Sequence, residues 1–161
     1  MREAIGSTWL IGIVITFIAI FSGFLAYSIS YTKAFRVKNE IINIIEKNEG
    51  YSSAGGVDLN IPDVLNENKS TEAKAFKFIK SIGYDYAKFD SSNPCSEGKL
   101  QTGGYCLAKY CPSNGETNRI YYKVTTYISL SIPIINVGVN LPISGETKAL
   151  YNDLGEFECE E

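Results

Sequence analysis

The hydrophobic pattern of the chain begins with a long segment that carries no charge. Residues 4–32 lie between Glu3 and Lys33 without a charged side chain. About 20 apolar residues span the hydrocarbon core of a bilayer, so this segment is long enough for one crossing. Trp9 stands near one end and Tyr27 near the other, as is typical of aromatic residues at membrane interfaces. We expect a membrane-spanning helix over about residues 4–32.

A cleaved secretory signal is the alternative interpretation of this segment. Ala26-Tyr27-Ser28 could serve as a small-x-small cleavage site. The uncharged segment is, however, much longer than the ~7–15 apolar residues of a signal peptide. The helical pattern also continues beyond it, which favours a retained anchor.

The pattern after residue 32 becomes amphipathic. Apolar residues recur at a spacing of three to four, at Ala34, Phe35, Val37, Ile41, Ile44 and Ile45. Charged residues occupy the other positions, at Lys33, Arg36, Lys38, Glu40, Glu46 and Lys47. Because neither Pro nor Gly occurs between Gly23 and Gly50, we expect one helix from about residue 4 to about 48, with Gly50 as its stop. This divides the chain into a helix over 1–49 and a domain over 50–161.

Small residues form a stripe along the membrane half of this helix. They follow one another three or four positions apart, at Thr8, Gly12, Thr16, Ala19, Gly23, Ala26, Ser30 and Ala34. Small faces allow membrane helices to approach closely, so that van der Waals packing holds them together. The stripe predicts a helix-packing site. The alternative is that small residues are simply common in membrane helices, since Ser22 and Ser28 fall outside the stripe.

The pattern over residues 50–161 predicts a small α+β domain. A short helix is expected over 70–83, capped by Ser70 or Thr71, and a loop region over 84–118. Alternation predicts strands over 119–131, 134–144 and 148–151, with a turn at 144–147. The predicted fold is α+β: a long N-terminal helix packed on an antiparallel sheet of three or four strands.

The domain contains an even number of cysteines in a region rich in Gly, Asn and Ser. They are Cys95, Cys106, Cys111 and Cys159. The spacing suits disulfides, and the pairing Cys95–Cys106 with Cys111–Cys159 is favoured by economy among the three possible pairings. A zinc site and reduced structural thiols are the alternatives. The chain lacks His and lacks paired C-x2–4-C spacing, both of which disfavour zinc.

Charge and composition disfavour several classes of function. The net charge is −3, which disfavours nucleic acid as a partner. The absence of His removes the commonest general base, and no nucleophile elbow or phosphate loop occurs. We therefore expect neither an enzyme nor a metal or cofactor site.

The side of the membrane on which the domain lies is indicated by two opposing signals. Lys33, Arg36 and Lys38 follow the span, which by the positive-inside rule would place the domain in the cytoplasm. The four cysteines instead suit an oxidising compartment. Because the basic residues continue the helix, where they could pair with Glu40, we favour an extracytoplasmic domain on a single-pass membrane protein at the cell surface.

The architecture resembles that of type IV pilins. An apolar and then amphipathic helix precedes a sheet with a disulfide-closed region, and the segments GSTWLIGIVITFIAIFSGFLA and YYKVTTYISLSIPIINVGVNLPISGETKAL look most like TadE-like pilins and pseudopilins of Tad-type systems. The prepilin cleavage block of that family is not intact here. The resemblance implies that Glu3 could match the family glutamate that sets register during assembly. Otherwise Glu3 simply lies in the first helical turn at the water interface, and processing after Gly6 would remove it.

The expected function is that of a structural pilin- or pseudopilin-like subunit. It would be inserted in membrane lipid before its helix bundles with copies of itself or with other pilin-like subunits, in a filament or a priming complex. The alternative is a monomeric, membrane-tethered binding or sensor domain that uses its Tyr-rich sheet as a recognition surface.

Overall fold

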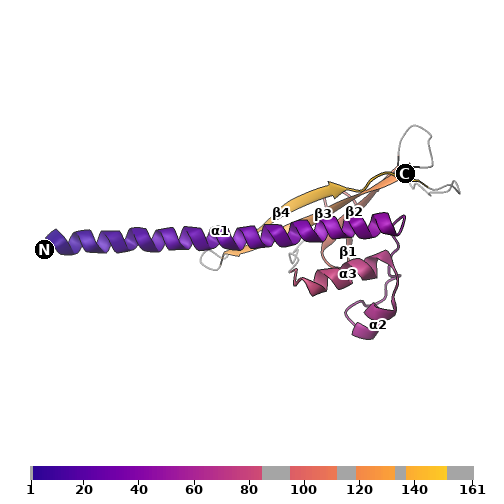
Figure 1. Cartoon of the computed structure of the whole chain (residues 1–161), viewed down its shortest axis with the longest axis horizontal. Coiled ribbons are helices and arrows are strands. Elements are labelled where there is room, and N and C mark those ends of the chain that lie inside the picture. Colours follow the sequence, from indigo (N-terminus) through magenta and orange to yellow (C-terminus); the bar gives the residue numbers. More distant parts are fainter. Residues whose placement is uncertain (1, 85–94, 112–118, 133–136, 152–161) are drawn as a thin grey trace.

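The computed structural model describes residues 2–84, 95–111, 119–132 and 137–151. One long helix, α1, lies along a small antiparallel sheet and projects far beyond it (Figure 1). Two shorter helices, α2 and α3, belong to the same end of the molecule as the sheet. This is the α+β architecture expected from the sequence, with a long N-terminal helix packed on a small sheet.

Helix α1 spans Arg2–Lys47, in agreement with the predicted single helix. At 1.5 Å per residue it is about 69 Å long. Its stop differs from the expected one, because Glu49 takes the left-handed conformation (φ 54°) and Gly50 follows it. The Gly50 N–H donates to the Ile45 carbonyl and the Glu49 N–H to the Glu46 carbonyl, which together form a Schellman motif.

The C-terminal half of α1 docks on the sheet. Ala34, Val37, Ile41 and Ile45 are all completely buried, as the apolar spacing predicted. They share a core with β3 (Arg119–Ile132), whose Ile120, Val124 and Ile128 are buried.

Two positions of α1 differ from the predicted amphipathic pattern. Phe35, expected on the buried face, remains 40% exposed, whereas Lys38, expected on the polar face, is only 9% exposed. A Cβ placed on Gly145 would lie 3.0 Å from Lys38 Cδ, so the Lys38 stem fills the space that this glycine leaves. The Lys38 ammonium lies 4.4 Å from the centre of the Phe35 ring, which gives it a cation–π partner.

The basic residues after the span do not have the partner suggested by the sequence. Lys33 donates to the Gly83 carbonyl at 3.3 Å, and Lys38 covers Gly145. Among the residues that the structure describes, no ion pair joins either of them to Glu40. The hydrogen bond from Lys33 to the turn after α3 indicates that part of this basic cluster holds α1 on the domain.

The sheet contains five strands, more than the three or four expected. They are β1 (Lys99–Gln101), β2 (Tyr105–Tyr110), β3, β4 (Val137–Glu146) and β5 (Leu150–Tyr151). Their order is β1-β2-β3-β4, with β5 pairing to β3, and every pairing is antiparallel. Strand β3 is therefore central, as its long alternating pattern suggested.

The sequence prediction was wrong about two segments of the domain. Residues 99–110, expected to be loop, form the β1–β2 hairpin, and Ser144 to Glu146, expected in a turn, complete β4. The chain turns only at Thr147, whose hydroxyl and amide both bond the backbone of Tyr122.

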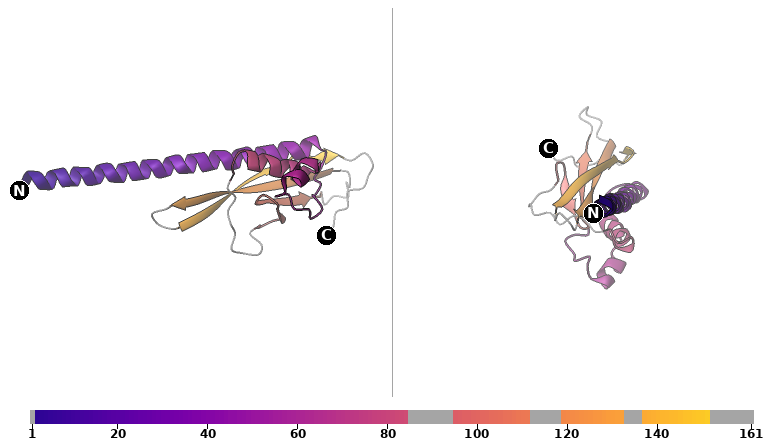
Figure 2. Two further views of the ribbon diagram at one scale, coloured as in Figure 1. Left: turned by 90° about the horizontal axis from the view of Figure 1, so that it is seen from below. Right: turned by 90° about the vertical axis from the view of Figure 1, so that its left-hand side faces the viewer.

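Helix α3 (Thr71–Ser81) matches the predicted short helix, and α2 (Pro62–Glu67) lies in a segment that the sequence indicated only as a link. Ser70 caps α3, since its hydroxyl accepts the Ala73 N–H at 3.1 Å. Ala73, Phe76 and Ile79 are buried as predicted. In both views of Figure 2, α3 lies beside the docked half of α1.

Candidate helix-packing site

The small-residue stripe lies on the part of α1 that projects from the domain. At 3.6 residues per turn its members fall within an arc of about 80° around the helix. Gly12, Thr16, Ala19, Gly23 and Ala26 are exposed. No other described atom lies within 4 Å of the position that a Cβ would take on Gly12 or Gly23. The stripe is therefore an open surface of the protein.

The stripe is continuous with the face that α1 turns toward its own sheet. Ser30 is half-buried, and Ala34, at the end of the stripe, is completely buried. The Ala34 carbonyl accepts a hydrogen bond from Thr126 Oγ1 at 3.1 Å. One side of the helix thus carries the intramolecular contact in its C-terminal half and the small residues in its N-terminal half.

Gly12 and Thr16 line a groove at one edge of the stripe, with larger side chains along its other side. The groove is completed by Trp9, Ile13, Phe17 and Ile20. Small residues beside a row of larger apolar side chains form a surface against which a second helix can pack.

Several hydroxyl groups within the apolar half of α1 bond to the backbone of the helix itself. Thr16 donates to the Gly12 carbonyl at 2.9 Å, Ser22 to Ile18 at 2.6 Å, and Ser28 to Phe24 at 3.0 Å. An unsatisfied hydroxyl would cost several kcal/mol in hydrocarbon. These internal bonds make the segment compatible with lipid despite its polar residues.

The length and exposure of this half suit a membrane. Within Trp9–Lys47 a segment has a mean hydropathy of 2.4, and α1 is long and apolar enough to cross a bilayer. Its apolar side chains are exposed, with Trp9 at 74% and Phe24 at 63%. Tyr27 and Tyr31 lie with ring centres 6.2 Å apart near the point where the helix meets the domain, as expected of residues at an interface.

Two predicted site residues have side chains outside the described part of the structure. The backbone of Glu3 and of Thr8 belongs to α1. The proposed register role of Glu3, and the place of the Thr8 side chain in the stripe, stay predictions.

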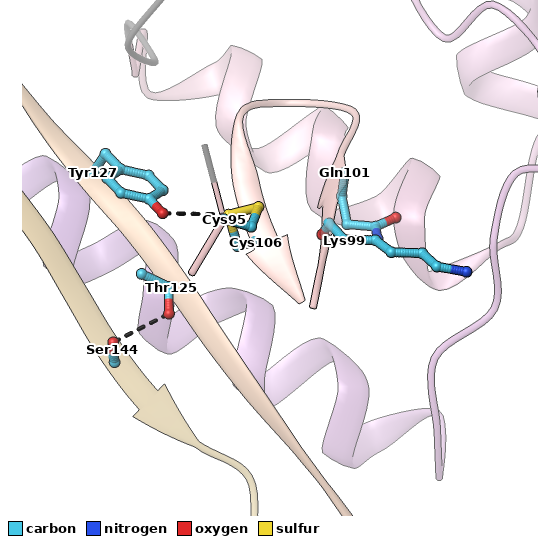
Figure 3. Close-up of a disulfide and its surroundings, with 7 residues drawn as sticks. All are labelled: Cys95, Lys99, Gln101, Cys106, Thr125, Tyr127 and Ser144. Carbon is cyan, nitrogen blue, oxygen red and sulfur yellow. Dashed lines mark hydrogen bonds between the residues drawn. A yellow bond between two sulfur atoms is a disulfide. The ribbon is translucent and has the colours of Figure 1, made fainter. Parts of the chain in front are cut away.

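The disulfide that the sequence favoured between Cys95 and Cys106 is present, with Cα atoms 5.7 Å apart. Tyr127 from β3 places its hydroxyl 3.4 Å from Cys106 Sγ (Figure 3). Because Thr126 points to α1 and side chains alternate along a strand, Tyr127 and the disulfide lie on the opposite face of the sheet. Cys111 is also disulfide-bonded. Cys159 lies outside the described residues, so its pairing with Cys111 stays a prediction.

The junction between α1, α3 and the β1–β2 turn contains a buried carboxylate that sequence reasoning missed. Glu72 Oε2 accepts the Ala54 N–H at 2.7 Å and the Ser53 hydroxyl at 3.0 Å, and Oε1 accepts the Thr102 N–H at 3.3 Å. Burial alone would raise the pKa of Glu72, but these bonds outweigh it and lower the pKa below the usual value. The sequence signal was limited to an acidic residue in the first turn of α3.

The hydrogen bonds of Glu72 join α3 to the segment after α1 and to the β1–β2 turn. Nearby, the Tyr51 hydroxyl donates to Gln101 Oε1 at 2.8 Å and lies 3.3 Å from the Tyr105 hydroxyl. Burial raises the pKa of both tyrosines, so both stay protonated. Within the described ranges, no group of acidic or cysteine side chains could hold a metal ion.

Comparisons with protein-family models, with curated proteins and with solved structures give no match to this chain. A function can therefore be inferred only from the residues and geometry of this chain.

Proposed function

We propose that this protein is a pilin- or pseudopilin-like structural subunit whose N-terminal helices pack together through the small-residue stripe. The observation that carries the proposal is that Gly12, Ala19, Gly23 and Ala26 form one open face on a helix of membrane-spanning length. A tether that only holds a domain at a membrane needs no such face. Helices that assemble need one, because close approach is their main source of packing energy in lipid.

In this proposal the unassembled subunits reside in the membrane. Before assembly, the exposed half of α1 lies in lipid and the sheet domain lies outside the cytoplasm. The disulfide between Cys95 and Cys106 supports an oxidising location for the domain. On assembly the stripe exchanges lipid for the helices of neighbouring copies or of other pilin-like subunits. The role is structural rather than enzymatic.

Glu3 is proposed to set the register of neighbouring helices by pairing with the amino terminus of an adjacent subunit. A carboxylate in a membrane-embedded helix is costly unless it is paired, which would favour one alignment over others. The intact mass of the assembled subunit tests this, because processing after Gly6 would remove Glu3.

The role of the stripe in packing is tested by replacing its small residues with larger ones. Gly12→Leu combined with Gly23→Leu should abolish filaments, seen by electron microscopy of sheared surface material, while the protein still fractionates with membranes. Ser22→Leu is the matched control, since Ser22 is also small and exposed but lies off the stripe. Unchanged assembly in the double variant, or equal loss in the control, would refute the stripe as the packing site.

A monomeric binding or sensor domain is the second candidate. Its specific support is an aromatic pair on the sheet face that points away from α1. The rings of Tyr110 and Tyr121 stack with centres 5.0 Å apart, and such rigid aromatic area suits recognition. Wild-type protein that stays monomeric in membranes and forms no surface filament would favour this candidate.

A further inference from the structure

The chain has a second long segment without charge, and it lies in the sheet. No charged residue occurs between Lys123 and Glu146, which covers most of β3 and nearly all of β4. The other such segment is residues 4–32 of α1. Sheet strands that face water on one side normally alternate apolar with polar residues, many of them charged. The absence of charge suggests that part of this hairpin meets something other than water.

The hairpin runs back along α1 toward its N-terminus. Lys148, just after β4, bonds Glu46 near the end of α1, whereas Thr126 in β3 bonds Ala34. Strand β3 therefore runs opposite to α1, and its last residue, Ile132, lies farther toward the projecting half. Figure 1 shows the end of β3 and the start of β4 level with the middle of α1, and Figure 2 shows that these strand ends stand away from the helix there.

Residue spacing gives the position along the α1 axis that the end of the hairpin reaches. From Thr126 to Ile132 the strand advances roughly 20 Å at 3.3 Å per residue. That distance corresponds to about 13 residues of helix, which reaches the neighbourhood of Phe21 when counted back from Ala34. The tilt of the strand away from α1 reduces this advance, so the hairpin end is level with the stretch between Phe21 and Leu25.

This level falls on the membrane side of the interface that α1 defines. Tyr27 and Tyr31 are the interfacial aromatics at this end of the span, and Lys33 is the first charge beyond them. A helix that crosses the bilayer with these residues at the interface therefore carries the hairpin end into the interfacial layer.

We propose that the end of the β3–β4 hairpin, Ser129–Ile132 with Val137–Leu141, enters the outer interface of the bilayer beside α1 as a second membrane contact. The two strands satisfy each other's backbone through the pairs from Ser129↔Asn140 to Ile132↔Val137. Their outer edges have no strand neighbour at this level among the described residues. Unpaired backbone is excluded from hydrocarbon. The hairpin end therefore resides in the hydrated interfacial layer and does not reach the bilayer centre.

Lipid is the occupant that the geometry favours over a second copy of the chain. The depth of the hairpin is fixed by its own α1, whatever the number of subunits, and the lack of charge suits an interface. The inference depends on the insertion of α1 and not on filament assembly, so the two proposals fail separately.

Fluorescence quenching by lipid tests this contact. The full chain is reconstituted at low density in phosphatidylcholine vesicles that contain a lipid spin-labelled near the headgroup end of its acyl chain. Trp9, the only tryptophan, reports insertion of α1 in the wild type. In a Trp9→Phe background, Ser131→Trp and Ile132→Trp place probes at two successive positions near the end of β3. Tyr151→Trp is the matched control, because Tyr151 is exposed and pairs with Arg119 at the far end of β3.

We expect both hairpin probes to lose about half of their fluorescence, as interfacial residues would, while the Tyr151→Trp probe keeps nearly all of it. An intact Cys95–Cys106 disulfide by mass spectrometry confirms that each variant has folded. Quenching of Trp9 without quenching of either hairpin probe above the Tyr151→Trp level would overturn the proposal. So would a hairpin-probe spectrum that changes with protein density and not with quencher, because a second copy would then cover the hairpin.

Discussion

Thr126 donates its hydroxyl hydrogen to the carbonyl oxygen of Ala34 at 3.1 Å, and both residues are completely buried. This bond joins the central strand to α1 within the docked part of the helix, near its N-terminal end. It is also where the docked face of α1 passes into the small-residue stripe. The pair therefore lies between the docked and the projecting parts of α1.

Replacing Thr126 by Val should weaken the docking of α1. The variant loses one buried hydrogen bond but leaves the Ala34 carbonyl its helical partner, so we expect a loss of about 1 kcal/mol in the free energy of unfolding. Denaturant unfolding of the full chain in mild detergent measures it. Thr125→Val is the control, since Thr125 bonds Ser144 on the exposed face and should change stability by less than about 0.5 kcal/mol. Equal losses would contradict a special role for the Thr126–Ala34 bond.

A glycine in the β1–β2 region is required by close backbone contact. Gly98 has φ +78°, and a Cβ there would lie 2.1 Å from the Leu107 carbonyl oxygen. We expect Gly98→Ala to cost roughly 3 kcal/mol or more, because left-handed strain and a backbone clash add together. Gly55→Ala separates the two effects, since Gly55 has φ +71° with nothing within 4 Å, and should cost only about 1 kcal/mol. Thermal unfolding of both variants followed by circular dichroism gives the comparison, and similar midpoints would show that the contact is relieved at no cost.

The long elements could be predicted from the sequence because each repeats one signal many times. Helix α1 follows from the uncharged segment and the apolar spacing beyond it. Strand β3 follows from the alternation at Tyr122, Val124, Thr126 and Ile128. The sequence indicated Ser70 or Thr71 as the cap of α3, and Ser70 is the one that caps it.

The remaining features depend on contacts that no local pattern contains. Strands β1 and β2 are short and are separated by the pair Gly103-Gly104, so the segment matched a loop. Lys38 is buried only because Gly145, distant in sequence, leaves room for its stem. In the candidate site, the order of small residues along the helix could be predicted from their spacing. The structure added that this face continues into the docking face at Ala34.

A proline in β4 is tolerated because its partner in β3 bonds elsewhere. Pro142 lies opposite Tyr127, whose N–H donates to the Tyr84 hydroxyl at 3.0 Å and whose carbonyl accepts from the same hydroxyl. Tyr84 thus takes the place of a strand neighbour beyond the start of β2. Tyr84→Phe should leave the Tyr127 amide without this partner and cost about 1–3 kcal/mol.

Tyr31→Phe provides the matched control for Tyr84→Phe. It removes the same hydroxyl from an exposed position and should change the free energy of unfolding by less than about 0.5 kcal/mol. Hydrogen exchange of the Tyr127 amide offers an independent readout. Unaltered protection of that amide in Tyr84→Phe would mean that another group satisfies it.

The disulfide between Cys95 and Cys106 should contribute measurably to stability. It joins residues 11 apart, and loop closure of that size corresponds to about 3 kcal/mol in the chain-entropy account. The double variant Cys95→Ser, Cys106→Ser should lose stability of this order. Reductant should lower the unfolding midpoint of the wild type more than that of the variant, and equal shifts would contradict the prediction. Non-reducing peptide mapping would also test the pairing of Cys111 with Cys159.

Glu72 should make stability depend on pH in the acidic range. Its pKa in the folded protein is lowered from the ordinary value of 4.5, so the carboxylate is favoured by folding. Its contribution is complete above that ordinary value and is lost as the pH falls through the folded pKa. Glu72→Gln should therefore be less stable than the wild type near pH 7, by about 1–3 kcal/mol, with a gap that narrows below the ordinary carboxyl pKa.

Denaturant midpoints measured across the acidic range give this dependence. Glu67→Gln is the control, because Glu67 is exposed at the end of α2 and its removal should leave the pH profile of the wild type in place. If Glu72→Gln has a gap of constant size at every pH, the carboxylate contributes through its shape and hydrogen bonds alone. The junction between α3 and the link after α1 would then be held independently of its charge.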